Sequence, residues 1–345
     1  MGVLDDIKRC VRLEEPERTP VFALSQEFDA RMSGLTYAEY VTDPKKAARC
    51  QIENIERFGY DWAWLHLDDC IEFEAIGVGV RIEGNVVPVT SGYLPATWET
   101  LRSLRLPDPH RHGRMPLLLE VIRRVREHFG DRIFVCGRTA APFSSVGLTY
   151  GTTALMLLTV DDPELLRVSM EFFVELQVEW GWAQIEAGAH GLWFGDCYAS
   201  SHFISPSTFK EFALEPARRV IEEYKKMGAI VIVHNSEESE DFFPLLAELG
   251  ADVISPGPGV DIGRVKELIG DKVCVIGNLD PIGVLAEGIP EDIRRETFAC
   301  FEKAGRAGYI FNTGECVPRH TPPENMEAMV QAAREADAAF RSPRM

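Results

Sequence analysis

The sequence predicts an α/β fold, a (β/α)₈ barrel of the TIM type, and two observations support this. Short apolar runs recur along the chain, each followed by a polar turn and a helical pattern. The runs are continuously apolar, which is typical of parallel strands buried on both faces. The main alternative is a doubly wound sheet, but no Gly-x-Gly-x-x-Gly or Walker-type loop is present. The eight predicted strands cover residues 20–24, 61–67, 133–137, 191–195, 230–234, 252–255, 273–277 and 308–312.

Helices are predicted between these strands. Apolar residues recur at helical spacing over 209–224, where Ser205 is the expected N-cap, Pro206 the first helical residue and Gly228 the stop. Asp-Pro pairs at positions 43–44 and 162–163 begin two further helices, expected to extend to about residue 58 and to residue 185.

An extra β-hairpin is expected before the third strand. Residues 79–90 alternate apolar and polar side chains around a Glu-Gly-Asn turn at 83–85. No composition shift or linker marks a boundary, so residues 1–345 are predicted to form a single barrel domain.

The composition excludes several classes of partner. The chain has 36 basic and 54 acidic residues and a formal net charge of −18. Such a surface repels phosphate backbones and anionic lipids, so neither nucleic acid nor membrane is expected as a partner. No apolar run approaches the roughly 20 residues of a spanning helix, and the first residues lack a signal-peptide core, so a cytoplasmic location is expected. The eight cysteines form no Cys-x-x-Cys pair.

In a barrel, the chemistry lies where the strands end. The predicted strand ends are rich in acid, imidazole and thiol side chains: Gln26, Glu27, His66, Asp68, Asp69, Arg138, Asp196, Cys197, His234, Glu237, Asn278, Asp280, Asn312, Glu315 and Cys316. His234 ends a wholly apolar run, and an imidazole together with the Cys316 thiolate would suit zinc. A hydrogen-bonded histidine and an inert loop cysteine are the alternative. Asp68 and Asp69 are expected to point apart, one toward the barrel mouth.

Several stretches, in order along the chain, are those of a known family. They are Phe58-Gly-Tyr-Asp61, Leu67-Asp-Asp with Glu74-Ala-Ile-Gly77, Ala141-Pro142, Phe203-Ile-Ser-Pro206, Gly277-Asn-Leu-Asp-Pro281, and Phe311-Asn-Thr-Gly314 through Thr321-Pro-Pro-Glu-Asn325. On these motifs the chain resembles the uroporphyrinogen decarboxylase superfamily, whose members share the (β/α)₈ barrel.

The resemblance implies that porphyrinogen decarboxylation is not the activity. True decarboxylases of the family hold the carboxylates of their substrate with arginines in an N-terminal stretch, and residues 23–29 contain none here. Asp68 falls at the catalytic aspartate of the family. However, the pocket tyrosine and histidine of the family are replaced by Leu148 and Glu315.

The resemblance is closer to the corrinoid-linked methyltransferases, including O-demethylase-like members. Thiol-methylating members bind zinc through a His-x-Cys pair and a later cysteine. His234 and Cys316 match the outer two ligands, but Ser236 stands at the middle position, so Glu237 or Glu315 would have to complete the site.

The predicted function is therefore a metal-dependent methyltransferase. It would move a methyl group between a small methylated donor or acceptor, such as a methoxylated aromatic compound, and the corrinoid of a partner protein. The predicted site residues are Asp68, Asp196 and Glu315 as catalytic groups, Arg138, Asn312 and His66 for substrate, and His234, Cys316 and Glu237 for zinc. A lyase acting on a smaller carboxylic acid and a non-catalytic binding barrel are the alternatives. A homodimer is expected from the resemblance.

Overall fold

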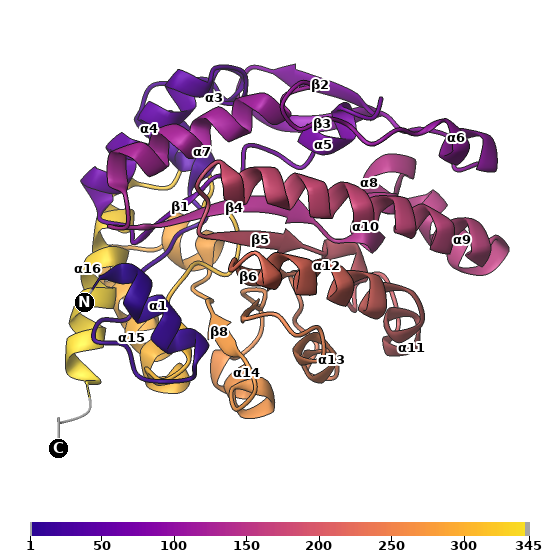
Figure 1. Ribbon diagram of the computed structural model, residues 1–345. Coiled ribbons are helices and arrows are strands. Elements are labelled where there is room, and N and C mark those ends of the chain that lie inside the picture. Colours follow the sequence, from indigo (N-terminus) through magenta and orange to yellow (C-terminus); the bar gives the residue numbers. More distant parts are fainter. Residues whose placement is uncertain (1, 342–345) are drawn as a thin grey trace.

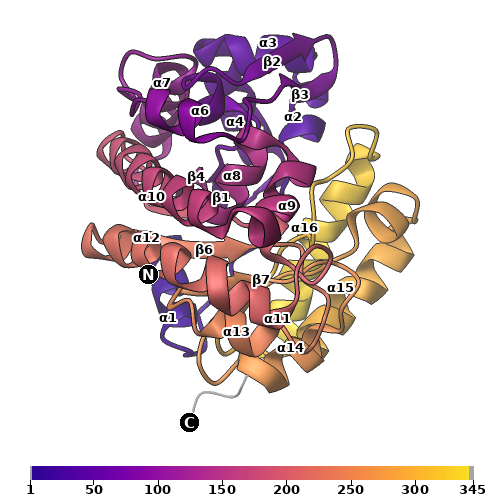
Figure 2. The ribbon, with the colours of Figure 1, turned by 90° about the vertical axis from the view of Figure 1, so that its right-hand side faces the viewer.

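A curled parallel sheet organises the molecule, and helices surround it (Figures 1 and 2). The computed structural model describes residues 2–341. Seven strands pair side by side in the order β1-β4-β5-β6-β7-β8-β9. Their bounds are β1 Trp62–Trp64, β4 Phe134–Ala140, β5 Gly191–Gly195, β6 Ile230–His234, β7 Val253–Ser255, β8 Cys274–Ile276 and β9 Tyr309–Ile310. The predicted TIM-barrel type of fold is confirmed.

The predicted first strand is reduced to a single bridge, which differs from the expectation of a full strand over 20–24. Val21 forms a parallel bridge with Phe311, and the Asp61 N–H donates to the Val21 carbonyl at 2.9 Å. This segment therefore lies between β9 and β1 and closes the curled sheet. The ladder stays short because Pro20 has no N–H, and because the Val21 N–H donates to the Asp61 carboxylate at 2.8 Å instead of to a strand.

Helices connect the strands and cover the outside of the sheet (Figure 1). Their bounds are α1 Val3–Val11, α2 Gln26–Met32, α3 Tyr37–Thr42, α4 Pro44–Phe58, α5 Ile71–Glu74, α6 Trp98–Ser103, α7 Met115–Phe129, α8 Pro142–Tyr150, α9 Thr152–Asp161, α10 Pro163–Glu186, α11 Pro206–Thr208, α12 Leu214–Lys226, α13 Phe243–Ala247, α14 Ile262–Ile269, α15 Pro290–Ala304 and α16 Pro323–Ala339, with the short turns η1 Cys197–Ala199, η2 Phe209–Ala213 and η3 Pro281–Ala286.

The sequence signals mark the helix starts correctly. The Asp43 carboxylate caps α4 by accepting from two backbone N–H groups, and Asp162 caps α10 by accepting from the Leu165 N–H. Ser205 accepts from the Thr208 N–H at the start of α11. The single helix expected after Ser205 is α11 followed by a π-helical turn, η2, and then α12. A π turn inserts one extra residue per turn and so divides the helix.

The expected hairpin is also confirmed. Strands β2 (Gly79–Glu83) and β3 (Val86–Gly92) pair antiparallel, and Gly84 has the positive φ that the turn between them requires. The Gly84 carbonyl accepts from the Ala38 N–H, which fixes the hairpin against α3 (Figure 1). Within residues 2–341, no single helix has the length and hydrophobicity to cross a membrane. The pair α8 and α9 passes the same test only together, across a bend of 115°.

Aromatic rings fill the sheet interior and lead toward the carboxyl ends of the strands. The ring of Phe22 stacks on Trp62 at 4.2 Å, and Trp62 lies parallel to Trp64 at 6.2 Å. His66 stacks on Trp64 at 4.7 Å. These alternate residues of one segment share a face, because side chains alternate along a strand. The packed core therefore continues without a break into the polar groups at the barrel mouth.

We predict that the close contact of β5 with its neighbours tolerates no side chain at Gly191. A Cβ there would collide with the Ile230 carbonyl and lie 2.6 Å from the Phe134 ring, and neither group is free to move. Gly191→Ala should lower the free energy of unfolding by about 1–3 kcal/mol, measured by urea denaturation. The control is Gly195→Ala on the same strand, where the nearest atom is 3.8 Å away. Equal midpoints for the two variants would contradict this packing.

Candidate active site

The candidate site is a cavity of about 100 Å³ at the carboxyl ends of the strands. Residues following β1 and β9 and residues at the ends of β4, β5 and β6 line it. The lining residues are Leu24, Trp64, His66, Asp69, Arg138, Trp193, Gly195, Cys197, His234, Glu315 and Cys316. No other hollow found in the described structure brings two histidines, two thiols, two carboxylates and an arginine together.

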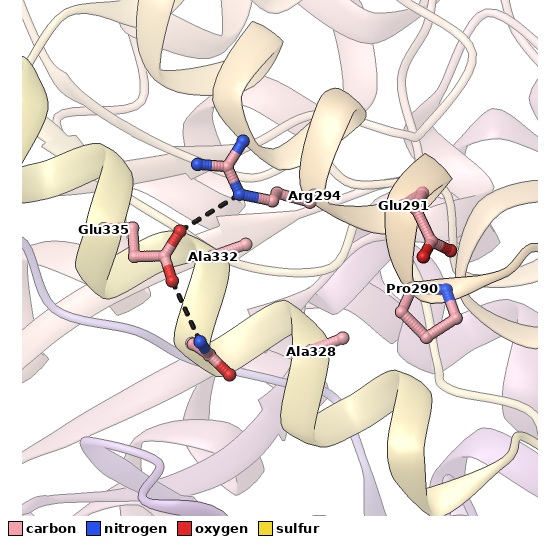
Figure 3. Close-up of a pocket in the computed structure, with 7 residues that line it drawn as sticks. Pro290, Glu291, Arg294, Ala328, Ala332 and Glu335 are labelled. Carbon is pink, nitrogen blue, oxygen red and sulfur yellow. Dashed lines mark hydrogen bonds and ion pairs between the residues drawn. The ribbon is translucent and has the colours of Figure 1, made fainter.

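A larger groove of about 180 Å³ lies elsewhere, between α15 and α16 (Figure 3). Arg294 forms an ion pair with Glu335 at 3.0 Å, and the other carboxylate oxygen of Glu335 accepts from Gln331 at 2.9 Å. These groups bind one another, and the groove contains no histidine or cysteine. It therefore offers less chemistry than the cavity at the strand ends.

Tryptophans hold the two cavity histidines in place. The His66 ring stacks on Trp64 with 4.7 Å between the ring centroids, and the His234 ring packs at a tilt against Trp193 with 4.9 Å between the centroids. The two tryptophans meet edge to face at 5.5 Å. The sequence favours a core role for these aromatics, whereas the structure shows that they also form cavity walls.

Arg138 lies within β4, which continues to Ala140 instead of ending at residue 137 as predicted, and its side chain is buried between two acidic side chains. It donates to the Glu72 carboxylate at 2.9 Å and forms an ion pair with Asp69. Burial alone would lower the pKa of Arg138, but the nearby carboxylates outweigh burial and raise it. Desolvation at the mouth acts against the charged form of Asp69, yet the charges of Arg138 and His66 hold the pKa of Asp69 below its usual range. Arg138 is therefore positively charged, and the carboxylates of Glu72 and Asp69 balance that charge.

His234, the last residue of β6, is buried and has hydrogen-bond partners on both ring nitrogens. Nδ1 lies 3.0 Å from the Ser255 hydroxyl, and Nε2 lies 3.0 Å from a carboxylate oxygen of Glu315. Ser236 contacts both Nε2, at 3.2 Å, and the same Glu315 oxygen. Burial alone would raise the pKa of Glu315, but His234 and Ser236 outweigh it and lower the pKa to about 2. Glu315 is therefore an ionised carboxylate in contact with the His234 ring beside the cavity.

Two thiols line the same cavity and are neutral as placed. Burial raises the pKa of Cys197 to about 12, and burial with the Glu315 charge nearby raises that of Cys316 well above its ordinary value. Cys197 Sγ lies 3.8 Å from Ser236 Oγ, and Cys316 Sγ lies 3.8 Å from the Gln26 amide.

The structure brings together some of the predicted site residues. His66, Arg138, His234, Glu315 and Cys316 all line the cavity. Asp68, Asp196, Glu237 and Asn312 are not among the lining residues. Their predicted roles stay predictions. Each of these four side chains is buried.

Asp68 and Glu237 have structural partners. Both carboxylate oxygens of Asp68 accept from Arg114, which comes from the loop before α7. Glu237 is fully buried and accepts hydrogen bonds from Ser201, Glu238 and Ser239. These bonds fix the loops after β1 and β6, on which His66 and Ser236 stand.

Asp196 and Asn312 are buried polar groups with few partners. Asp196 accepts from the Ser144 hydroxyl at 2.7 Å, and burial without a nearby cation raises its pKa to about 7. Neither amide atom of Asn312 has a hydrogen-bond partner among the described residues.

The predicted site residues omit six residues of the cavity lining: Leu24, Trp64, Asp69, Trp193, Gly195 and Cys197. Asp69 and Cys197 are among the polar residues that the sequence places at strand ends. Their position alone does not show which of those residues face the cavity. For the Asp68–Asp69 pair, Asp69 is the one that faces the mouth, because Arg114 holds Asp68. The tryptophans carry no signal that separates a cavity wall from core.

The residues as placed do not form a metal site. Among residues 2–341, no three His, Cys, Asp or Glu side chains are grouped so that they could hold a metal ion. The Nε2 atom of His234, which would be a ligand, binds Glu315 and Ser236 instead. The zinc prediction is not tested by this arrangement.

Comparisons with known proteins match nearly the full length of the chain. The family described as uroporphyrinogen decarboxylase (URO-D) matches residues 4–336. The uroporphyrinogen decarboxylase of Carboxydothermus hydrogenoformans is 26% identical over 344 residues, with 96% of each chain covered. That of Chlorobium phaeovibrioides is 24% identical over 352 residues, covering 96% of this chain and 97% of the relative. Among solved structures, a methyltransferase from Methanosarcina mazei has a TM-score of 0.89 at 21% identity, covering 97% of this chain and 99% of its own.

The contact between Glu315 and His234 should make the free energy of unfolding depend on pH in the acid range. Because its pKa falls from 4.5 to about 2 on folding, Glu315 contributes stability fully above about pH 4.5 and loses it as the pH falls toward 2. The stability difference between wild type and Glu315→Gln should therefore be largest above pH 4.5 and shrink below it, as followed by thermal unfolding. Glu291→Gln, at an exposed position on α15, is the control. A difference that does not change between pH 6 and pH 3 would contradict the pairing.

Proposed function

The chain belongs to the uroporphyrinogen decarboxylase family, and we propose that within this family it is a methyltransferase. It would move a methyl group between a small methylated substrate, such as a methoxylated aromatic compound, and the corrinoid of a partner protein. The likeness in fold to the Methanosarcina mazei methyltransferase, over nearly the full length of both chains, supports this proposal. The observation that carries it is the His234–Glu315 pair in a small cavity whose arginine is already neutralised.

The charge of the cavity supports methyl transfer over porphyrinogen decarboxylation. A porphyrinogen with about eight carboxylates needs several free cations to hold it. Arg138 is the only arginine or lysine among the described lining residues, and it is bound to Glu72 and Asp69. The cavity is also smaller than the roughly 300–1,000 Å³ usual for drug-sized ligands. A small, uncharged substrate group fits these conditions better than a large polyanion.

The His234–Glu315 pair would manage the proton of the reaction. In demethylation the methyl–oxygen bond breaks, its electron pair stays on oxygen, and protonated His234 gives the Nε2 proton to that oxygen. Glu315 stays ionised and stabilises the imidazolium. In the reverse direction, His234 would take the proton from an acceptor hydroxyl or thiol. A substrate oxygen would replace Ser236 as the second neighbour of Nε2. The corrinoid of the partner protein would supply the nucleophile that accepts the methyl group.

Zinc is the alternative to this proton-transfer role. His234, Cys316 and Glu315 line one cavity and include the nitrogen and sulfur donors that zinc takes, and Glu237 is the further ligand that the sequence suggests. Bound zinc would act as a Lewis acid on the substrate heteroatom. His234 Nε2 cannot bind zinc and Glu315 at the same time, so the two forms exclude each other.

We predict methyl transfer that depends on the pair. With anisole as donor and a reduced free corrinoid as acceptor, the wild-type protein should form the methylated corrinoid, which is followed by absorbance. His234→Gln should lower kcat by about 10²–10⁴-fold, since it removes a general acid. Glu315→Gln should also lower kcat, and Glu291→Gln should leave kcat unchanged. Carbon dioxide release from a small carboxylic acid without methyl transfer would instead support the lyase alternative.

Metal analysis separates the two forms of the site. In the proton-transfer form, protein purified without added metal should contain well under one zinc per chain, measured by mass spectrometry. Chelator treatment should leave methyl transfer unchanged. One zinc per chain in the wild type, lost in both His234→Ala and Cys316→Ala, would contradict the proton-transfer form and establish the zinc form.

A further inference from the structure

Glu72 is a buried acid that does not line the cavity but pairs with an arginine that does. It lies on α5, its side chain is 1% exposed, and its Oε1 atom accepts from Arg138 Nη1 at 2.9 Å. Arg138 lines the cavity, and its second carboxylate partner is Asp69, which lines the cavity as well. The guanidinium therefore has one acidic partner inside the cavity lining and one outside it.

The two carboxylates differ in how easily a ligand could replace them. The Asp69 side chain is 56% exposed, so it can turn toward solvent and give up its place beside Arg138 to an incoming anion. Such a carboxylate is solvated when it leaves the pair, so the exchange costs little. Glu72 is buried and has no such alternative, because without Arg138 it would be an uncompensated charge in the interior.

Hydrogen bonds fix Glu72 in this position. Gln177 of α10 is fully buried and donates from its amide nitrogen to Glu72 Oε1 at 3.3 Å and to the Ser145 hydroxyl at 3.1 Å. The amide oxygen of Gln177 accepts from the Ala140 N–H at the end of β4 at 3.2 Å. Helices α5, α8 and α10 and strand β4 meet in this buried network, which keeps the Glu72 carboxylate against Arg138.

We propose that Glu72 is a specificity-determining residue: its charge prevents Arg138 from binding an anionic group, so the cavity rejects carboxylate ligands. The inference rests on the proposed function for the place of the substrate, and it adds the residue outside the cavity that decides which charge a substrate can carry. Arg138, Asp69 and Glu72 together carry one net negative charge. A ligand carboxylate that entered beside Asp69 would bring a third negative charge to a single arginine, at short range in a buried site.

Removing the Glu72 charge should reverse this preference. In Glu72→Gln the side chain keeps its length, and its amide oxygen can still accept from Arg138 and Gln177. Arg138 then has one carboxylate partner instead of two, so a ligand carboxylate restores the charge balance that Glu72 provides in the wild type. The loss of a buried partner favours that replacement, because an uncompensated buried charge destabilises the protein.

Trifluoroacetate is the probe, since it is small, stays ionised near neutral pH and can be followed by ¹⁹F NMR. Wild type, Glu72→Gln and Glu74→Gln are titrated at pH 8, because burial raises the pKa of Glu72 and this pH keeps the wild-type carboxylate ionised. Glu74→Gln is the matched control: Glu74 lies on the same helix, but its partner is Arg114, which is not among the cavity residues. Trifluoroacetamide, in which an amide replaces the carboxylate, is the neutral comparison.

We expect Glu72→Gln to bind trifluoroacetate about tenfold or more tightly than wild type, as a charge-assisted hydrogen bond to Arg138 would give. Glu74→Gln should match the wild type, and trifluoroacetamide should not distinguish the three proteins. Adding Arg138→Met to Glu72→Gln should abolish the gain. Where Glu72→Gln is too unstable for titration, the same binding appears as a rise of its thermal unfolding temperature with trifluoroacetate but not with trifluoroacetamide.

Equal affinity of wild type and Glu72→Gln for trifluoroacetate, or a gain that survives Arg138→Met, overturns the inference. An equal response of the unfolding temperature to both compounds overturns it as well. None of these measurements depends on turnover, so an inactive protein that shows the expected binding would refute the proposed function and leave the role of Glu72 standing.

Discussion

The ion pairs of the buried Arg138 are the interaction on which the cavity depends. Its guanidinium joins Glu72 of α5 to Asp69 of the loop after β1, and Asp69 in turn contacts His66. A buried arginine must be compensated, and removing one partner of such a pair leaves an uncompensated charge. These ion pairs therefore hold the loop after β1 and helix α5 to β4 at the barrel mouth. Arg138, the one arginine among the described lining residues, has both of these carboxylates as partners already.

The hydrogen bonds of His234 organise the other side of the barrel mouth. His234 ends β6, Ser255 holds one ring nitrogen, and Glu315 faces the other. Trp64 packs against His66, Trp193 packs against His234, and the two tryptophan rings contact each other edge to face. These contacts fix the orientation of the His234 ring, and His234 and Ser236 hold the pKa of Glu315 at about 2. The small volume of this cavity and the pairing of its arginine are the reasons for which we propose a small neutral methyl compound as substrate.

The sequence predicts the fold well because the fold follows from local signals. Continuous apolar runs place β5 and β6 at their observed bounds, and aspartate before proline marks the starts of α4 and α10. The site is predicted less completely, because the direction of a side chain in a loop depends on distant contacts. Asp68 turns away from the cavity toward Arg114, 46 residues later in the chain, and no local pattern reports that pairing. The burial of Glu237 is set in the same way, by a loop after β5.

If Arg138 is fully engaged by Glu72 and Asp69, the cavity should not bind a polycarboxylate. Calorimetric titration of the protein with a porphyrinogen polycarboxylate measures this, under anaerobic conditions that keep the ligand reduced. We expect no saturable binding, because the charge of Arg138 is already balanced by these two carboxylates. Tight binding of one molecule per chain that is lost in Arg138→Met would contradict it, since it would show that Arg138 exchanges its partners for the carboxylates of a substrate.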